Sequence, residues 1–375
     1  MQLLNILVPI LFPGFAFLIW SQAPLYGLWL LKIFVTEANI FFAFAAVLIA
    51  TMYRAQGQGT LAAIAAFGLF VSGLALLSPY MSAVKVAADN GLPLSAVFPA
   101  NLASGFISQS DASESHQAQP IETFVYQTTS DNKALAMDFY RGASQGSLSP
   151  TIILVHGGSW RSGDRQEMQW IPQALAKRGY NVASIDYQLA PEALYPKPVE
   201  DVFAAVDYLK SRSQELSIDV KRMILMGRSA GAQIAVAAAY QRSDIRAVID
   251  LYGPMDLIWG YENSKPWHIV DGQAVIGAYL GGSPSDRRSV YEAASPVLHV
   301  SPSTPPTLIL HGTNDELVSI EHSRMLAGKL KENKIPHELV ELPWATHGFD
   351  FVSFGPGSNI MMTLIERFLR THANA

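Results

Sequence analysis

The chain of 375 residues contains no cysteine. This absence excludes disulfide bonds, thiolate nucleophiles, zinc–thiolate sites and iron–sulfur clusters. Charge is also scarce, because 15% of the residues are Asp, Glu, Lys or Arg, against about 25% in ordinary soluble domains. The 26 basic and 31 acidic residues give a net charge of −5. That balance lacks the basic excess which nucleic-acid binding needs, so we expect no nucleic-acid partner.

The shortage of charge is concentrated at the N-terminus. Residues 1–84 hold only three charged side chains, Lys32, Glu37 and Arg54. Uncharged or nearly uncharged runs approach the roughly 20 residues that cross a bilayer. They lie at 3–20, at 25–52 with a crossing portion near 38–52, and at 61–80. We predict that 1–84 is a transmembrane helical region of about three spans, in a multi-pass protein of a bilayer such as the bacterial inner membrane.

Two other interpretations of this region were weighed. A cleaved signal peptide lacks support, since no Lys or Arg precedes the first run and no clear cleavage site follows it. A buried soluble bundle would need long runs with almost no charge to be shielded from water. The basic residues do not distinguish the two orientations across a membrane. The polar, small-residue stretch 85–120 is predicted to be a linker.

From residue 121 onwards, clusters of β-formers alternate with segments of helical period. Such alternation is typical of a doubly wound, mostly parallel sheet, which binds ligands at the carboxyl ends of its strands. We predict one α/β catalytic domain over 121–375. Strands are expected at 122–128, 135–140, 151–155, 181–186, 223–226, 247–251, 307–310 and 338–342, and helices at 166–178, 198–212, 230–240, 320–333 and 360–371.

A serine flanked by glycines separates a predicted strand from a predicted helix. The sequence is GRSAG, with Gly227, Ser229 and Gly231. A serine on a sharp strand-to-helix turn needs small neighbours because the flanking backbone approaches adjacent elements closely. An ordinary glycine-rich turn would also fit these five residues, but the flanking strand and helix favour Ser229 as a nucleophile.

A second motif, HGGSW at 156–160, directly follows the predicted strand 151–155. Glycine lets backbone N–H groups turn toward a developing oxyanion without a Cβ in the way. Gly157 and Gly158, together with the N–H of Ala230, are the candidate oxyanion donors. Trp160 is the candidate substrate-binding residue. The histidine of the motif is expected to tie the loop down and not to act as a base.

A serine nucleophile needs a general base, and the base needs an acid to orient it. Asp315 follows the strand predicted at 307–310, and His347 follows the last predicted strand. The order Ser229, Asp315, His347 is the order in which this type of site is built. The competing bases are His311, His322 and His337, and the competing acids are Asp256 and Asp350.

These motifs together resemble the α/β-hydrolase esterases of the hormone-sensitive-lipase-like and bifunctional feruloyl/acetyl-xylan esterase-like groups. The resemblance covers about residues 121–373. It implies an α/β-hydrolase fold behind the N-terminal helical region, and it assigns the nucleophile, acid, base and oxyanion donors named above. It also implies a structural role for Asp201. The segments that carry it are HGGSWRSGDR, DYQLAPEALYPKPVEDVFAAVDYL, GRSAG, ASPVLHVSPSTPPTLILHGTNDELV and HGF.

The chain departs from the family pattern at one residue of the second motif, and from the regular strand–helix alternation in one segment. Ser159 stands where hormone-sensitive-lipase-like proteins usually have a third glycine, which affects the acyl substrate more than the triad. Residues 255–294 interrupt the regular alternation and are rich in aromatic side chains. They are expected to form either an apolar cap over Ser229 or surface aromatics on the sheet edge. The aromatics are Trp259, Tyr261, Trp267, Tyr279 and Tyr291.

The predicted function is a membrane-anchored serine hydrolase that cleaves carboxylic esters through an acyl-enzyme. No metal or organic cofactor is expected, because the side chains complete the chemistry. The expected partners are a small-molecule or lipid ester and the lipid bilayer. Two alternatives stay open: an amidase or peptidase of the prolyl-oligopeptidase-like or kynurenine-formamidase-like type, and a hydrolase-fold binding protein without activity.

Overall fold

The computed structural model describes residues 2–55, 59–98, 121–143, 148–264 and 269–373. These residues form two compact units that interleave along the chain. The first contains the described residues within 1–112 together with 312–316 and 341–363. The second contains those within 113–311, with 317–340 and 364–375. The second unit carries most of the sheet, and the first carries the N-terminal helices.

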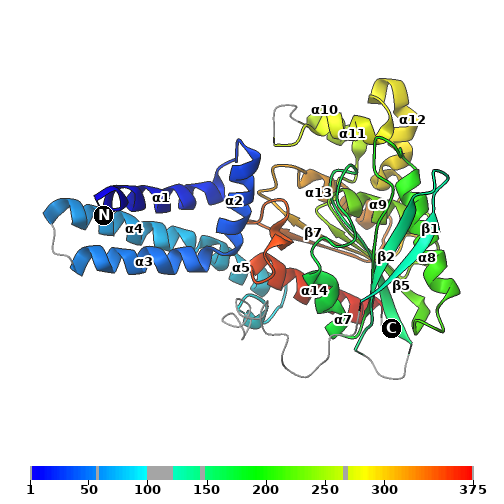
Figure 1. Cartoon of the computed structure of the whole chain (residues 1–375), viewed down its shortest axis with the longest axis horizontal. Coiled ribbons are helices and arrows are strands. Elements are labelled where there is room, and N and C mark those ends of the chain that lie inside the picture. Colours follow the sequence, from blue (N-terminus) through cyan, green and yellow to red (C-terminus); the bar gives the residue numbers. More distant parts are fainter. Residues whose placement is uncertain (1, 56–58, 99–120, 144–147, 265–268, 374–375) are drawn as a thin grey trace. The chain divides into compact units, whose positions relative to one another are not determined.

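The N-terminal helices of the first unit pack on one another. In Figure 1, α1, α3 and α4 run alongside each other, and α4 contacts both α1 and α3. A small apolar core lies among them, with Ile19, Ala46 and Leu69 fully buried. The elements are α1 (Gln2–Trp20), α2 (Tyr26–Glu37), α3 (Asn39–Ala55), α4 (Gly59–Leu76), α5 (Ser78–Asp89) and η1 (Leu94–Ala96).

These helices do not support the three membrane spans that were predicted. Among the described residues, one helical segment is long and apolar enough to cross a bilayer. It is Ala63–Asp89, which runs from α4 into α5. Helices α2 and α3 reach that length only as a pair bent by 80°. The part of α1 whose side chains are described, Leu11–Trp20, is too short. The predicted multi-pass arrangement is therefore corrected: the described residues contain one helix that could cross a bilayer, and a second such segment only if α2 and α3 together are taken as one span.

The second predicted span fails for a physical reason. The chain turns at Ala38, between α2 and α3, and the charged residues Lys32 and Glu37 on α2 are both buried. Each of them has a polar partner from the C-terminal third of the chain. Charges that look like interruptions of a span are therefore paired with protein groups. The predicted linker 85–120 stays a prediction, because α5 and η1 occupy its start and 99–120 lie outside the described residues.

All eight predicted strands are present, in one sheet of order β1-β2-β4-β3-β5-β6-β7-β8. Strands β1 and β2 pair antiparallel, β2 and β4 also, and β4, β3, β5, β6 and β7 run parallel. Their bounds are β1 (Glu122–Thr128), β2 (Ala134–Tyr140), β3 (Ser149–Val155), β4 (Asn181–Ile185), β5 (Ile218–Arg228), β6 (Ala247–Leu251), β7 (Thr307–Gly312) and β8 (His337–Leu342).

The last strand pair is also parallel. The Thr307 N–H donates to Pro336 O, and the Thr313 N–H donates to Leu342 O, both at 3.0 Å. The two bonds keep the same offset along both strands, which is the register of a parallel pair. The carboxyl ends of β5, β7 and β8 therefore lie at the same edge of the sheet.

The predicted helices after residue 121 are also present, with shifts of a few residues at their ends. The buried helix α9 follows β5 and packs on β5 and β6, and its eleven residues are all buried. Residues 255–294, predicted only as irregular, contain three further short helices. The elements are α7 (Trp170–Lys177), α8 (Lys197–Ser211), α9 (Ala230–Tyr240), α10 (Leu257–Asn263), α11 (Gly272–Leu280), α12 (Pro284–Ala294), η2 (Pro296–His299), α13 (Glu321–Glu332), η3 (Phe349–Phe351) and α14 (Pro356–His372).

The aromatic side chains of this segment are not all surface groups. Tyr279 and Tyr291 are fully buried, and their rings contact other aromatics at 4.7 to 6.2 Å. Trp259 and Tyr261 are half-buried, and Trp267 lies outside the described residues. The interpretation as surface aromatics is therefore wrong for the two tyrosines, which belong to the core.

Candidate active site

Ser229 occupies a strained turn between β5 and α9. Its backbone dihedral angles are φ 53° and ψ −123°, in a region that non-glycine residues rarely adopt and that costs about 1–3 kcal/mol. Hydrogen bonds on both sides hold this geometry. The Ser229 N–H donates to Leu251 O and the Ala232 N–H donates to Ser229 O, each at 2.9 Å. The turn places Ser229 at the N-terminus of α9.

The two glycines around Ser229 are required by space. A Cβ on Gly227 would lie 2.2 Å from Gly231 O, and one on Gly231 would lie 2.1 Å from His156 O. No side chain can be accommodated at these distances, which are far below van der Waals contact. The motif is therefore a tight turn wedged against the β3 loop, as the sequence pattern predicts for a nucleophile.

The loop after β3 passes beside the serine. A Cβ on Gly157 would lie 3.5 Å from the Ser229 Cβ. Gly158 has a φ of +108°, and a Cβ there would come within 2.0 Å of Ser162 O. The backbone at Gly157 therefore runs close to Ser229. This placement fits the predicted oxyanion donors, to which the N–H of Ala230 on the first turn of α9 is the third.

His156 is held as a structural residue. Its ring stacks on Tyr187 at 4.2 Å between centroids, and its Nδ1 lies 2.7 Å from Gly157 O. Burial lowers the pKa of His156 to about 4, so the imidazole is neutral at physiological pH. A neutral ring with a backbone partner fixes the loop and is unsuited to carry the catalytic proton.

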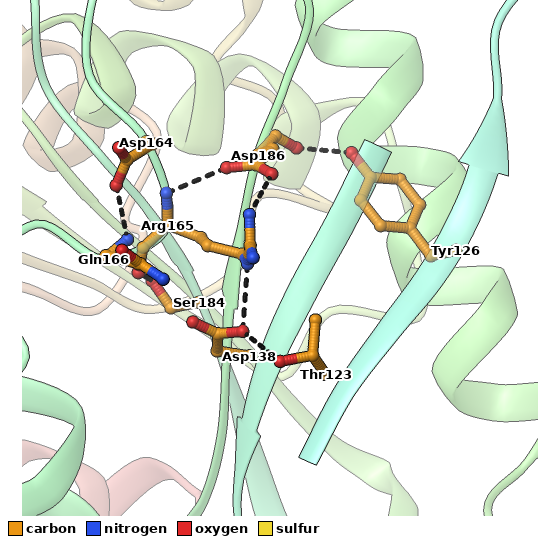
Figure 2. A network of polar contacts seen from close by, with 8 residues as sticks. All are labelled: Thr123, Tyr126, Asp138, Asp164, Arg165, Gln166, Ser184 and Asp186. Atoms are coloured by element: carbon orange, nitrogen blue, oxygen red, sulfur yellow. Dashed lines mark hydrogen bonds and ion pairs between the residues drawn. The ribbon is translucent and has the colours of Figure 1, made fainter. Parts of the chain in front are cut away.

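A polar network ties the rest of this loop to the sheet (Figure 2). The Arg165 guanidinium donates to Asp138 Oδ1 on β2 at 2.9 Å and to Asp186 Oδ2 after β4 at 2.8 Å. The backbone N–H of Arg165 also donates to Asp186 at 2.9 Å. Ser184 donates to Arg165 O, and Thr123 on β1 donates to Asp138, both at 2.7 Å. Arg165 thus joins β2 to the end of β4, and through Asp138 to β1. The loop after β3 that carries the predicted oxyanion donors, the oxyanion loop, is therefore anchored on its far side.

Trp160 is buried, with 3% of its surface exposed. Its ring stacks on Tyr279 at 4.7 Å and an interplanar angle of 6°. Its indole N–H donates to Gln233 Oε1 at 2.9 Å, and the Gln233 amide donates to Ala294 O. The structure thus gives Trp160 partners on α9 and α11, and Gln233 links it on to the end of α12. Its role in binding substrate stays a prediction.

Asp315 and His347 are brought together within the first unit. His347 Nδ1 lies 2.7 Å from Asp315 Oδ2, and their side chains are 7% and 0% exposed. With this contact the carboxylate accepts the Nδ1 proton and leaves Nε2 as the atom that can exchange a proton with a substrate. Both residues follow strands whose carboxyl ends share an edge with that of β5, the strand before Ser229.

The competing bases have other partners. His311 Nδ1 lies 2.6 Å from Ser323 Oγ, and its Nε2 lies 2.9 Å from Val318 O. His322 Nδ1 lies 3.3 Å from the backbone N–H groups of Met255 and Asp256, just before α10, and accepts from them. His337 Nδ1 lies 2.8 Å from Ile335 O. Each of these three rings has a backbone group as a hydrogen-bond partner. His347, in contrast, contacts the carboxylate of Asp315.

The competing acids are also placed differently. Asp256 caps α10, where its side chain accepts the Trp259 N–H at 2.9 Å. Asp350 is fully buried in η3. Asp201, for which the family resemblance implies a structural role, accepts both the backbone N–H and the amide of Gln188, at 2.8 and 2.9 Å. Among the described residues, no cluster of three or more His, Asp and Glu side chains is suited to hold a metal ion.

Sequence reasoning missed one residue next to this pair. The ring of Trp29 on α2 lies 6.5 Å from the His347 ring and is 4% exposed. No motif links a tryptophan of an apolar N-terminal helix to a histidine in the last part of the chain. The one available signal was the uneven distribution of charge in 1–84, where two of the three charged side chains, Lys32 and Glu37, lie on the same helix as Trp29.

Several known proteins resemble much of the chain. The chain is 26% identical over 267 residues to esterase LipC of Mycobacterium tuberculosis, covering 65% of this chain and 64% of LipC. It is 27% identical over 227 residues to an acetyl esterase of Salmonella paratyphi A, covering 55% of this chain and 67% of that protein. The chain spans between about half and two thirds of the length of the first curated relatives.

Among solved structures, a bacterial heroin esterase aligns with a TM-score of 0.62 at 22% identity, over 78% of this chain and 98% of that one. This likeness shows the α/β-hydrolase fold. A model of the BD-FAE family matches residues 137–330, more than half of the chain. This segment contains the oxyanion loop, the serine turn and Asp315. On the strength of that match and of the fold, the chain belongs to the BD-FAE family of α/β-hydrolases.

Proposed function

We propose that the protein is a carboxylic ester hydrolase that works through an acyl-enzyme on Ser229. The observation that carries this proposal is the strained backbone of Ser229, held between two glycines that leave no room for a Cβ. Strain of this kind persists where the surrounding structure imposes it, and it is concentrated at functional sites. The esterase relatives and the contact between His347 and Asp315 support the same conclusion.

In the proposed mechanism the Ser229 hydroxyl attacks the ester carbonyl while His347 Nε2 accepts its proton. The N–H groups of Gly157, Gly158 and Ala230 donate to the oxyanion of the tetrahedral intermediate. The intermediate then collapses and breaks the bond to the alcohol, which leaves with the proton from His347. Asp315 keeps the imidazole in the required tautomer and offsets its positive charge.

Water completes the cycle. It attacks the acyl-enzyme while His347 removes one of its protons, and the second tetrahedral intermediate releases the carboxylic acid. The proton returns to Ser229. Atoms and charges balance with ester and water as the only reactants, so the protein side chains named here supply every proton transfer.

We propose short acyl chains as the substrates. The similarity to an acetyl esterase supports this choice. So does the packing beside the oxyanion loop, where the buried rings of Trp160 and Tyr279 stack on each other and leave little freedom to move. The proposal sets the acyl chain against Trp160, where a long chain would have to displace this pair together with the hydrogen bond from Trp160 to Gln233.

The full-length protein tests this proposal with p-nitrophenyl esters from acetate to palmitate and with aminoacyl p-nitroanilides. We expect turnover of acetate to butyrate, with kcat/KM at least about tenfold higher than for palmitate, and no turnover of the anilides. A fluorophosphonate probe should label one peptide, the one containing Ser229. Turnover of the anilides alone would instead indicate an amidase, and no labelling at all would indicate a binding protein without activity.

We also propose that the N-terminal helices associate with a lipid bilayer. Large apolar side chains lie on their outer surfaces, where water would meet them in solution, and exposed apolar surface on this scale marks an interaction site. The most exposed of them are Phe17 at 73%, Phe44 at 71%, and Phe67 and Met81 at 70%. Helix Ala63–Asp89 is the segment suited to cross the bilayer.

Membrane association is tested by alkaline carbonate extraction of membranes from cells that express the chain. We expect the wild-type protein to stay in the pellet. A variant with Phe17, Phe44 and Phe67 changed to Ser should be released more readily, because each burial in lipid contributes about 1.5–3 kcal/mol. The control changes Leu148 and Leu298, exposed in the second unit, to Ser and should stay in the pellet. Equal release of all three proteins would contradict the proposal.

A further inference from the structure

The segments that carry Asp315 and His347 belong to the same compact unit as the N-terminal helices. Residues 312–316 and 341–363 group with those helices and not with the bulk of the sheet. The contacts responsible come largely from α2 and the residues just before it. Two of the three charged side chains in residues 1–84 take part in them.

On the side of the acid, both neighbours of Asp315 are held. The Asn314 amide donates to Ile19 O at 2.7 Å. Glu316 forms an ion pair with Lys32, and the two side chains are 3% and 0% exposed. The backbone of Asp315 is thus fixed from both directions by the N-terminal segment.

Each member of the Lys32–Glu316 pair makes one further hydrogen bond. Lys32 Nζ also donates to Ser21 O at 2.8 Å, and the second Glu316 oxygen accepts the Ala23 N–H at 2.9 Å. A buried ion pair is costly to break from one side, because the remaining charge is left without a partner. Such a pair holds the backbone of one segment against the other.

On the side of the base, α2 supplies packing. Trp29 lies 6.5 Å from the His347 ring and 6.2 Å from Phe351, between ring centroids. Its Nε1 is buried and has no hydrogen-bond partner among the described residues. The indole therefore acts here by its shape, as a surface against which the imidazole rests.

Glu37, at the end of α2, holds both ends of the segment around His347. Its carboxylate accepts the Trp344 Nε1 proton at 3.2 Å and the N–H of Gly357, on the first turn of α14, at 2.8 Å. An oxygen acceptor at a helix N-terminus satisfies a free backbone N–H. A Cβ on Gly355 would lie 2.3 Å from Glu37 Oε2, so the segment is shaped to receive this side chain.

We infer that α2 is part of the catalytic apparatus: Trp29, Lys32 and Glu37 are positioning residues that fix the acid and base loops for turnover. The inference rests on the function proposed above. It adds that the N-terminal region sets the rate of the reaction and is not only a means of attachment. Small displacements of catalytic groups are enough for a large effect, since about 1 Å can cost about 100-fold in rate.

The test compares full-length Trp29→Ala, Trp29→Phe and Lys32→Met with wild type on p-nitrophenyl acetate. Lys85→Met is the matched control, because it breaks an exposed ion pair with Asp89 in the same helical region. We expect Trp29→Ala and Lys32→Met to lower kcat by about 10- to 100-fold, with KM within about threefold. Trp29→Phe keeps a ring against His347 and should retain most of kcat. Lys85→Met should match wild type.

Hydrogen exchange by mass spectrometry gives a second readout that does not depend on turnover. Lys32→Met should speed exchange in peptides covering 312–316 and 341–355, while β3 and β5 keep their protection. This pattern separates a local loss of positioning from global unfolding. If Lys32→Met loses protection everywhere, its kcat is not interpreted. The kcat of Trp29→Ala compared with that of Trp29→Phe then tests the positioning role.

The outcomes separate this inference from the proposed function. Normal kcat in both Trp29→Ala and Lys32→Met, with an active wild type, would overturn the positioning role and leave the esterase proposal intact. Equal losses in Trp29→Ala and Trp29→Phe would also overturn the role of the ring. Failure of the wild type itself to turn over any ester would remove the proposed function and this inference together.

Discussion

Replacing Ser229 with Ala should lower kcat for p-nitrophenyl acetate by about 10⁶-fold, the loss typical of removing the nucleophile from a site of this type. Alanine cannot form the acyl-enzyme, and the residual rate then comes from binding and the oxyanion donors alone. Labelling by the fluorophosphonate probe should disappear as well. The melting temperature should stay close to that of wild type, because Ala occupies the same strained backbone.

The control for this variant is Ser285→Ala, which removes an exposed serine hydroxyl from α12. It should leave both turnover and labelling unchanged. Retention of turnover in Ser229→Ala would mean that another group performs the attack, and the proposed mechanism would have to be abandoned. Loss of turnover together with a fall in melting temperature would instead show that the substitution had damaged the fold.

The second large effect is expected for Asp315→Asn, which should lower kcat by about 10⁴-fold. The amide N–H₂ of asparagine can donate to Nδ1 and carries no negative charge, so it favours the tautomer that places the proton on Nε2. His347 then cannot accept the proton of Ser229. KM should change much less than kcat, since Asp315 is assigned no contact with the substrate.

Asp256→Asn provides the comparison for this effect, because Asp256 is the competing acid and caps α10. Asparagine is also a good N-cap residue, so stability should fall by no more than a few tenths of a kcal/mol. Activity should remain within about threefold of wild type. The opposite ranking of the two variants, measured side by side at one pH, would assign the acid to Asp256.

The sheet and the serine turn could be predicted from the sequence because their signals are local. All eight strands are present, and each was visible as a short run of β-formers bounded by turn residues. The glycines beside Ser229 are similarly explicit, because close backbone approach excludes every other residue. Short local stretches of sequence were therefore enough to predict the strands and the serine turn.

The N-terminal region was misread because its decisive contacts are not local. Lys32 and Glu37 looked like interruptions in an apolar run, and the run was assigned to a membrane span. Their partners lie 284 and 320 residues further along the chain, and no periodicity or motif connects such positions. The sequence places the start of a crossing portion near residue 38, but it does not show that α2 is held by these contacts.

The three short helices α10, α11 and α12 were missed for a different reason. They are 7, 9 and 11 residues long, and isolated helices of this length are marginal in water. Packing stabilises them, as the burial of Tyr279 and Tyr291 indicates. Aromatic residues spaced by glycine and serine therefore gave a weak signal for helix although the segment is ordered.

The contacts of α2 have a consequence for the order in which parts of the chain can fold during synthesis. Lys32 and Glu37 are synthesised before Glu316 and Gly357, which lie 284 and 320 residues further along the chain, so their pairing must await the residues between them. Closing such long loops is slow and comes late in folding. A chain that stops before Gly357 lacks the contact through which Glu37 holds the segment of His347. Under the proposed mechanism, such a chain would have its base unanchored.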